Sequence, residues 1–317
     1  MNNPPLHPPR GYTLVELSIA MGMIGVVGLI IYTVLNGGMV LFSKNVATNY
    51  SNLTVGGAAQ RMIQDLHESI GRAELVGSNL QPVAGESAVG VRFPLLLNEA
   101  AVRVISDNSG NTTINSVSST DTVSLRISLP PVVPKTGDIF ILPDINDRSG
   151  NALARTIISV SVGNPTVVTV KDLGINLNIS TDTPPDPTIA YIARLAAYSL
   201  VTTATDSAGL PYRTELRFYP DAGDTTRYSV ITHNIATYLP ALTTGDYQAP
   251  FGSGSVAPPV GPFSFAPSGT SFPENSIFVQ MMSINADTGR RSFSGDRMLL
   301  SQIIPPKALI LQSTNYN

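Results

Sequence analysis

The stretch from Gly11 to Ser43 constrains this chain most, because it holds a single charged side chain, Glu16, in an otherwise apolar run. From Leu17 onward the run is long enough to supply the ~20 apolar residues that a helix needs to cross a bilayer core. A carboxylate carried into such a segment costs about 2.5 to 3.5 kcal/mol unless it reaches the surface or finds a partner. The sequence therefore predicts a membrane-spanning helix in which Glu16 needs a positive neighbour.

One cleavage of the chain would create a cation at the right depth. If the bond after Gly11 is cut, Tyr12 gains a free α-amino group, and a second copy shifted along the helix axis would bring this amine to Glu16. The sequence R-G-Y-T-L-V-E-L, which begins at Arg10, resembles the leader junction of type IV prepilins and pseudopilins. The resemblance implies that a prepilin peptidase in the inner membrane removes residues 1–11 and methylates the amine of Tyr12, with Arg10 marking the cytoplasmic side.

Two other interpretations of the N-terminus are weaker. The leader MNNPPLHPPRG lacks the apolar segment of a secretory signal, and the apolar run exceeds the usual 7 to 15 residues and ends without a small-residue cleavage site. A cleaved secretory signal and an uncut membrane anchor remain the alternatives. Within the run, the neighbours Gly37 and Gly38 each weaken a helix by roughly 1 kcal/mol relative to Ala, so we expect a bend at Gly37.

Beyond Lys44 the chain becomes amphipathic. Apolar residues recur at the three-and-four spacing of one helical face, and polar residues occupy the other face. Gly77 is suited to end the helix, so we expect a helix from Tyr12 to about Val76, with Gly37 and Gly56 as the places where it would break. The expected apolar face consists of Val46, Tyr50, Leu53, Ala59, Met62, Ile63, Leu66, Ile70 and Ala73.

After Gly77 the sequence changes to short alternating runs rich in Val, Ile, Thr, Ser, Gly and Pro, which indicate antiparallel strands and turns. The predicted fold class is α+β, with a long N-terminal helix packed on a β-rich domain. The expected parts are a leader at 1–11, a membrane and assembly half of the helix at 12–43, an amphipathic half at 44–78 and a β-rich domain at 79–317. The expected strands are 88–93, 101–106, 122–127, 138–142, 154–162, 167–173, 189–201, 214–219 and 278–284, with turn signals that include 107–111 and 147–151.

Several later runs strengthen the resemblance. The helix end QRMIQDLHESIGRAE, followed in order by STDTVSLRI, GDIFILPD and LPYRTELRFYP, resembles the large minor pilins of the PilW type and, more distantly, the J-type minor pseudopilins. The resemblance implies a subunit of a type IV pilus or a type II secretion pseudopilus. It also implies three kinds of partner in the bacterial inner membrane: the prepilin peptidase, other pilin or pseudopilin subunits, and an assembly platform.

The segment 240–273 is rich in Pro, Gly and Ser and poor in charge, which predicts a long irregular loop. Either this loop is a flexible surface segment, or it contacts a partner subunit, because long ordered loops often carry function. Its aromatic residues, the contact groups for the second case, are Tyr247, Phe251, Phe263, Phe265 and Phe272.

Catalysis has little support in the sequence. The motifs of nucleophile elbows, zinc proteases, P-loops and dinucleotide-binding folds are absent, and His233 is the one histidine of the β-rich part. The chain has no Cys, so disulfides and thiolate sites are excluded. Asp144, Asn146 and Asp147 could ligate calcium, but their spacing fails the EF-hand pattern, and a hairpin turn is the simpler interpretation. We expect no enzyme and no cofactor.

The functional expectation is a structural minor subunit, assembled through its N-terminal helix at or near a filament tip, with its β-rich domain in the periplasm. The alternative is a pilus-associated adhesin or a DNA-capturing binding module, which would need a solvent-facing aromatic or basic cluster. Charged residues make up only 13% of the chain, the net charge is -3, and basic residues are scattered. The sequence therefore gives no clear nucleic-acid site.

The first prediction concerns processing. The mature chain should begin at Tyr12, because Gly11 precedes the predicted cut and Glu16 follows it at the spacing of the prepilin motif. The intact mass of the membrane-extracted protein checks this prediction. A mature terminus at another residue, or retention of Met1, would contradict the resemblance.

Overall fold

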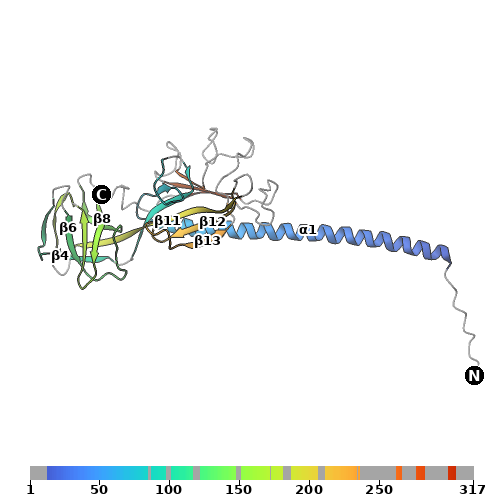
Figure 1. The fold of residues 1–317 in the computed structure, drawn as a ribbon, viewed down its shortest axis with the longest axis horizontal. Helices are drawn as coiled ribbons and strands as arrows, with labels where there is room; N and C mark the ends of the chain where they lie inside the picture. The colour runs from blue at the N-terminus through green and yellow to red at the C-terminus, as the bar shows by residue number, and fades with distance from the viewer. Residues whose placement is uncertain are drawn as a thin grey trace, which may run out of the picture. The chain divides into compact units, whose positions relative to one another are not determined.

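The computed structural model describes residues 13–84, 87–97, 101–116, 122–147, 151–171, 173–180, 187–205, 211–233, 235, 262–265, 276–282 and 299–304 (Figure 1). The chain divides into two units, Met1–Tyr50 and Ser51–Asn317, and each is treated by itself. Arg10, Gly11 and Tyr12 lie outside the described residues, so the predicted cleavage site stays a prediction.

Helix α1 spans Leu14–His67. It runs without a break through Gly37 and Gly56, where an interruption was expected. The helix ends earlier than predicted, because the expected end at Val76 belongs to a strand. Past the helix end, the amide of Ile70 donates to the carbonyl of Pro94 at 3.2 Å, which draws the chain to a neighbouring strand. Irregular backbone, followed by pairing of residues 74–76 with that strand, therefore replaces the last turns of the predicted helix.

The β-rich part confirms the predicted α+β class, and all strand pairings among the described residues are antiparallel. The expected strands match observed ones within a few residues, and 122–127 matches at both ends. The strands are β1 (Glu74–Val76), β2 (Ser87–Ala88), β3 (Gly90–Leu96), β4 (Val102–Asp107), β5 (Thr113–Ser116), β6 (Thr122–Ile127), β7 (Ile139–Asn146), β8 (Ala152–Ser161), β9 (Thr166–Lys171), β10 (Ile175–Asn178), β11 (Ile189–Thr205), β12 (Pro211–Tyr219), β13 (Ser229–His233), β14 (Phe263–Phe265), β15 (Ile277–Met282) and β16 (Leu299–Ile304).

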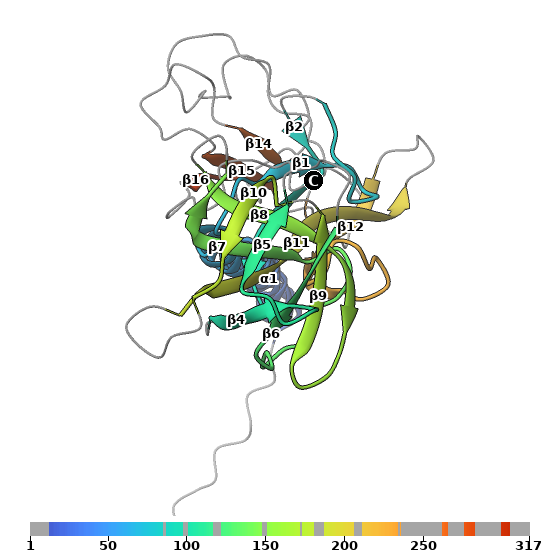
Figure 2. The ribbon, with the colours of Figure 1, turned by 90° about the vertical axis from the view of Figure 1, so that its left-hand side faces the viewer.

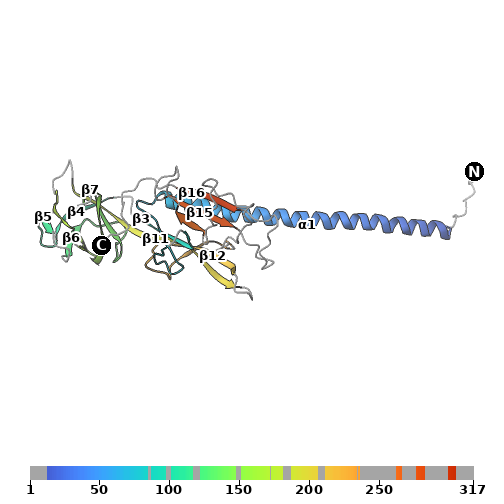
Figure 3. The same cartoon turned by 90° about the horizontal axis from the view of Figure 1, so that it is seen from above.

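Strand β11 is the longest strand, with 17 residues, and takes part in two regions of the main sheet. Its first residues, Ile189 to Ala193, pair with β4 and β7. Its later residues pair with β3 as far as Ser199 and with β12 as far as Thr205. Figure 3 shows β11 running from the strands around β4 and β7 to those around β3 and β12. One strand thereby joins two separate hydrophobic cores.

The first of these, which we call the helix core, forms where the end of α1 packs on the sheet. Its members lie on one face of the helix, on β3, β11 and β12, and on the small sheet of β2, β14, β15 and β16. Leu53 belongs to the expected apolar face but is 76% exposed, and Val55 takes a buried place instead. The buried helix residues are Val55, Ala58, Ala59, Met62 and Leu66.

The predicted irregular loop at 240–273 needs a correction. Within it, residues Phe263–Phe265 form strand β14, which pairs with β15 and β2. Phe263 is fully buried in the helix core, so its aromatic ring is a core group and not a surface contact group. Tyr247, Phe251 and Phe272 lie outside the described residues.

The second core, which we call the strand core, lies between strands at the other end of β11. Its residues come from strands in which buried and less buried positions alternate. Strands β6 and β9 bury every second residue, for example Val123, Leu125 and Ile127 on β6. The two-stranded sheet of β5 and β10, seen side by side in Figure 2, adds Ile114 and Leu177 to the same core. This period of two explains why the strands of this core were predictable from sequence.

Two turns of similar sequence share one hydrogen-bonding pattern. In the first, the amide of Asp107 donates to the carbonyl of Asn111, and the amide of Asn111 donates to Asp107 Oδ1 at 2.7 Å. Asp147 and Asn151 repeat both contacts, with the second at 3.0 Å. The carboxylate thus closes each loop, as Asp does in turns, and both predicted turns are confirmed. Gly110, at φ 87°, supplies the left-handed residue of the first loop.

A buried tyrosine fastens the helix end to the sheet. The hydroxyl of Tyr198, on β11, donates a hydrogen bond to Asp65, on α1. The Tyr198 ring lies against Phe93 and Phe218, with centroid separations of 5.9 Å and 5.0 Å. Burial raises the pKa of the Tyr198 phenol above its ordinary value, and the hydrogen bond to Asp65 raises it further. A Cβ at Gly90 would lie 2.7 Å from the carbonyl oxygen of Tyr198, so only Gly allows this close approach.

The second prediction concerns this contact. Tyr198→Phe should lower the unfolding free energy at neutral pH by about 2 kcal/mol, because Asp65 loses its buried donor. In the wild-type chain the phenol ionises in the unfolded state above pH about 10, while the folded state retains the proton. The stability that Tyr198 contributes is therefore fully present below that pH and decreases above it, and Tyr198→Phe should lessen this decrease.

Urea unfolding of the full chain at neutral pH and above pH about 10, followed by circular dichroism, checks both parts. Tyr228→Phe is a matched control, because Tyr228 is 43% exposed. This control should unfold like the wild-type chain. Equal alkaline losses in the wild-type chain and Tyr198→Phe would contradict the role given to Tyr198.

Candidate functional site

The N-terminal part of α1 is long and apolar enough to cross a membrane once. The segment Leu14–Phe42 contains 29 residues with a mean hydropathy of 2.3. Its large apolar side chains are exposed in the isolated chain, as at Leu29 and Phe42. Such a segment is compatible with a single-pass membrane protein, because a bilayer would cover the apolar surface that water would otherwise contact.

Glu16 lies in the first turn of this segment and forms a capping box with Thr13. The backbone amide of Thr13 donates to Glu16 Oε2 at 2.9 Å, and the Thr13 hydroxyl donates to the same oxygen at 3.1 Å. In return, the amide of Glu16 donates to Thr13 Oγ1 at 3.2 Å. The sequence T-L-V-E therefore satisfies free amide groups at the helix start. Sequence reasoning found Glu16 but missed this role, although the T-x-x-E spacing signals it.

The capping box leaves one oxygen of the Glu16 carboxylate able to accept a further hydrogen bond. Both hydrogen bonds from Thr13 go to Oε2, so Oε1 can accept from another group. Glu16 is exposed in the isolated chain, and a carboxylate at a helix N-terminus is favoured by the helix dipole. Cap formation and contact with an external cation are therefore compatible functions of one side chain.

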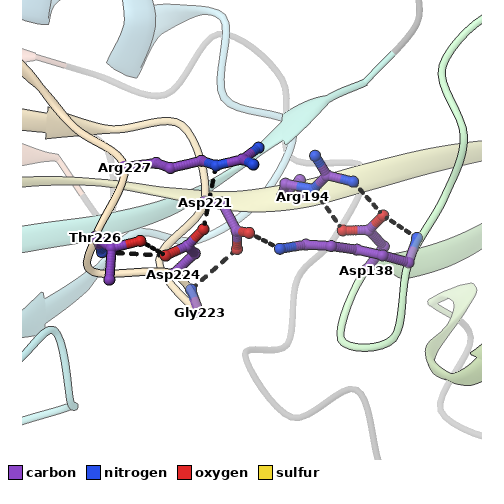
Figure 4. A network of polar contacts seen from close by, with 8 residues as sticks. Asp138, Arg194, Asp221, Gly223, Asp224, Thr226 and Arg227 are labelled. Carbon is purple, nitrogen blue, oxygen red and sulfur yellow. Dashed lines mark hydrogen bonds and ion pairs between the residues drawn. The ribbon is translucent and has the colours of Figure 1, made fainter.

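A second polar group lies in the β-rich part, where two ion pairs connect three segments (Figure 4). Asp138, just before β7, is buried and binds Arg194 of β11 through both carboxylate oxygens, at 2.7 Å and 2.8 Å. Lys135 pairs with Asp221 in the turn after β12. Burial lowers the pKa of the Lys135 ammonium, and the nearby Arg194 adds to this effect. We interpret this network as structural, because its carboxylates are engaged by cations.

The outer side of β12 and β13 carries a third group, which we call the β12–β13 face. Register places its side chains on the sheet side opposite Leu216, which is buried in the helix core. Arg217 binds Glu215 through two nitrogens, at 2.8 Å and 2.7 Å, and its guanidinium lies 4.2 Å from the centre of the Tyr228 ring. The members are Glu215, Arg217, Tyr219, Tyr228, Val230 and His233.

His233, the one histidine of the β-rich part, lies on this face. Its Nδ1 is 3.9 Å from Glu215 Oε1, and its side chain is 62% exposed. The alternation in the sequence T-E-L-R-F-Y already places Glu215, Arg217 and Tyr219 on one side of a strand. The partners on β13 were not predicted, because that strand was missed.

The calcium candidates lie on β7 and in the loop that follows it. Asp144 and Asn146 belong to strand β7, while Asp147 closes the hairpin loop to β8. Within the described part of the chain, no group of three or more His, Asp or Glu side chains is arranged to hold a metal ion. The hairpin interpretation of this segment is confirmed.

Comparisons with known proteins give no relative. No protein-family model, no curated protein and no solved structure matches this chain. The assignment of function therefore depends on the motif at the N-terminus and on the geometry of the described residues.

The third prediction concerns the buried ion pair. Asp138→Asn should lower the unfolding free energy by about 3 to 5 kcal/mol, because Arg194 would keep a charge in a site with little water and lose its partner. Asp224→Asn is the control, because Asp224 pairs at 3.7 Å with Arg227, whose side chain is 84% exposed. This control should unfold close to the wild-type midpoint. Urea unfolding of the full chain measures both, and similar midpoints for Asp138→Asn and the wild-type chain would contradict the assignment.

Proposed function

We propose that this chain is a minor subunit of a type IV pilus or of a type II secretion pseudopilus, assembled through its N-terminal helix. The observation that carries the proposal is the sequence R-G-Y-T-L-V-E-L at the start of a membrane-length helix. The capping box supports it, because it fixes the helix start at Leu14 and holds the acid in the first turn. An α+β architecture with the helix end packed on an antiparallel sheet is compatible with the same proposal.

In the proposed cycle, Glu16 performs two tasks at different times. Before assembly the acid lies at the cytoplasmic end of the span, where it can reach the headgroup region. After cleavage and methylation by a prepilin peptidase, the amine of Tyr12 on an adjacent subunit meets Glu16 in surroundings with little water. Oε1 is the oxygen that can accept this amine, because Oε2 caps the helix. The ion pair with this amine compensates the cost of the Glu16 charge and thereby favours assembly into the filament.

The proposal assigns locations and partners as well. The subunit resides in the bacterial inner membrane as a single-pass protein, with residues 51–317 in the periplasm, and later joins the filament at or near its tip. Its partners are the prepilin peptidase, other pilin or pseudopilin subunits and the assembly platform. The bulk of the β-rich domain favours few copies, because large domains would crowd each other along a closely packed helical filament.

A second candidate function is a pilus-associated binding module. The observation that favours it is the solvent-facing aromatic group on the β12–β13 face, where Tyr228 is 43% exposed. The DNA-capturing version is not favoured by this face, because Arg217 is already paired with Glu215. An adhesin-like role is compatible with a structural role in the same filament.

The fourth prediction separates the charge of Glu16 from its role as a cap. Glu16→Leu removes both, whereas Glu16→Gln keeps a side-chain oxygen that can accept from Thr13. Both variants should be inserted, and both should be cleaved after Gly11, because the cleavage site is unchanged. Both should be recovered poorly with partner subunits, because stranding one member of a buried pair costs about 3 to 5 kcal/mol.

Co-purification of partner subunits, at equal membrane levels of each variant, is the measurement. Ser18→Leu is the control, because Ser18 lies close to Glu16 on the same helix and its hydroxyl donates to the carbonyl of Leu14, at 2.9 Å. Normal recovery of Glu16→Gln with poor recovery of Glu16→Leu would assign Glu16 to helix capping alone. Normal recovery of both would show that Glu16 is not an assembly contact.

A further inference from the structure

The β12–β13 face combines aromatic, apolar and polar side chains, some of them exposed. Three of its residues are open to solvent. Tyr228 is 43% exposed, Val230 is 39% exposed, and the side chain of His233 is 62% exposed. Arg217 and Glu215 form the less exposed part between them, with side chains 19% and 21% exposed. An aromatic ring, an apolar side chain and three polar groups are therefore presented together.

Contacts within the face hold its side chains in place. Tyr228 is fixed on one ring face by the Arg217 guanidinium at 4.2 Å and along its side by Tyr219, whose ring centre is 5.7 Å away. Tyr219 is itself buried at 3% exposure, together with Leu80 and Ala222. A side chain that is already ordered loses little freedom when a ligand binds. The exposed part of the Tyr228 ring is thus a preorganised contact.

The charges of Glu215 and Arg217 balance each other on this face, and this balance favours an uncharged ligand. Glu215 accepts two hydrogen bonds from Arg217 and lies 3.9 Å from His233. Burial alone would lower the pKa of Arg217, but hydrogen bonds to Glu215 and Tyr219 outweigh this effect and raise it, so the guanidinium stays charged. No surplus of positive charge remains among these residues for a phosphate or a sulfate. An uncharged ligand fits this balance.

The geometry of β13 argues against an added strand as the occupant. A shift in register interrupts the pairing of β12 and β13 between Leu216 and Arg217. Irregularities of this kind at a sheet edge hinder pairing with the strand of another protein. The side chains of the face are therefore the better contact surface than the backbone of its edge strand.

We propose that the β12–β13 face binds an uncharged saccharide. The exposed part of the Tyr228 ring and the side chain of Val230 contact the apolar face of a sugar ring. An aromatic side chain offers a large apolar area for such a contact. Glu215 and His233 supply an acceptor and a donor for sugar hydroxyls beside the ring. The inference does not depend on the filament assignment, because it uses only contacts within residues 211–233.

Saturation-transfer NMR tests the proposal with maltotriose, cellotriose and chitotriose as probes. The full chain is kept in a zwitterionic detergent, because alkyl glycosides would compete for the same face. At least one trisaccharide should receive saturation from the wild-type chain. Calorimetric titration should then give an affinity that Tyr228→Ala weakens roughly tenfold or more, while Tyr228→Phe, which keeps the ring, stays within about threefold of the wild-type chain.

Phe265→Ala is the matched control, because Phe265 is an aromatic residue of similar exposure, 38%, on a different sheet. This variant should bind like the wild-type chain. Urea unfolding shows whether each variant is folded, and Glu215→Gln supplies a second test that leaves the aromatic ring in place and should also weaken binding.

Three results would overturn the proposal. The first is the absence of saturation transfer to all three sugars, and the second is equal affinity for the wild-type chain and Tyr228→Ala. The third is preferential binding of a single-stranded oligonucleotide that is lost at high salt, which would show that a polyanion is the ligand. A failure of the Glu16 variants to change assembly leaves this inference untouched, so the two proposals fail separately.

Discussion

Strand β11 contributes residues to the helix core and to the strand core, so its register sets which side chains reach each of these cores. Tyr198 points to the helix core, while Ser199, the next residue, lies under Gly90 on the opposite side of the sheet. A slip by one residue would exchange the two and place a hydroxyl where an aromatic ring meets Asp65. The Asp138–Arg194 pair holds the register in the first half of the strand, because an ion pair with this geometry tolerates little displacement. The helix end, the helix core and the strand core all depend on this one alignment.

The sequence predicted best those elements that obey a simple period. Residues 122–127 alternate, and both ends of that strand were correct. The end of α1 was not predictable in this way, because residues up to Ala73 keep helical spacing while the carbonyl of Pro94 captures the amide of Ile70. Competition between a local helix and a distant strand has no signature in a single stretch of sequence. Short strands such as β1 and β14 were missed for the same reason, since their partners, and not their own residues, make them strands.

The candidate sites also differ in whether their residues are close together in sequence. Glu16 could be identified from sequence, because an acid in an apolar run is conspicuous and its capping partner is three residues away. The Asp138–Arg194 pair joins residues 56 positions apart, and neither residue stands out in the sequence. On the β12–β13 face, alternation marks Glu215 and Arg217, but Tyr228 joins them only through the pairing of two strands. A charged residue in a polar segment is unremarkable until its neighbours are known.

The two turns closed by Asp107 and Asp147 also show where the entropy cost of folding is concentrated. Each loop joins residues four positions apart, whereas the ladder between β3 and β11 joins Gly90 to Ser199, across about a hundred residues. The entropy cost of loop closure grows with the logarithm of loop length, so closing this ladder costs about 3 kcal/mol more than closing either turn. In a chain without a cysteine, no covalent bridge lowers that cost. The burial of Tyr198 and its neighbours must offset this entropy cost. The ladder between β3 and β11, which joins residues far apart in sequence, is therefore also well packed.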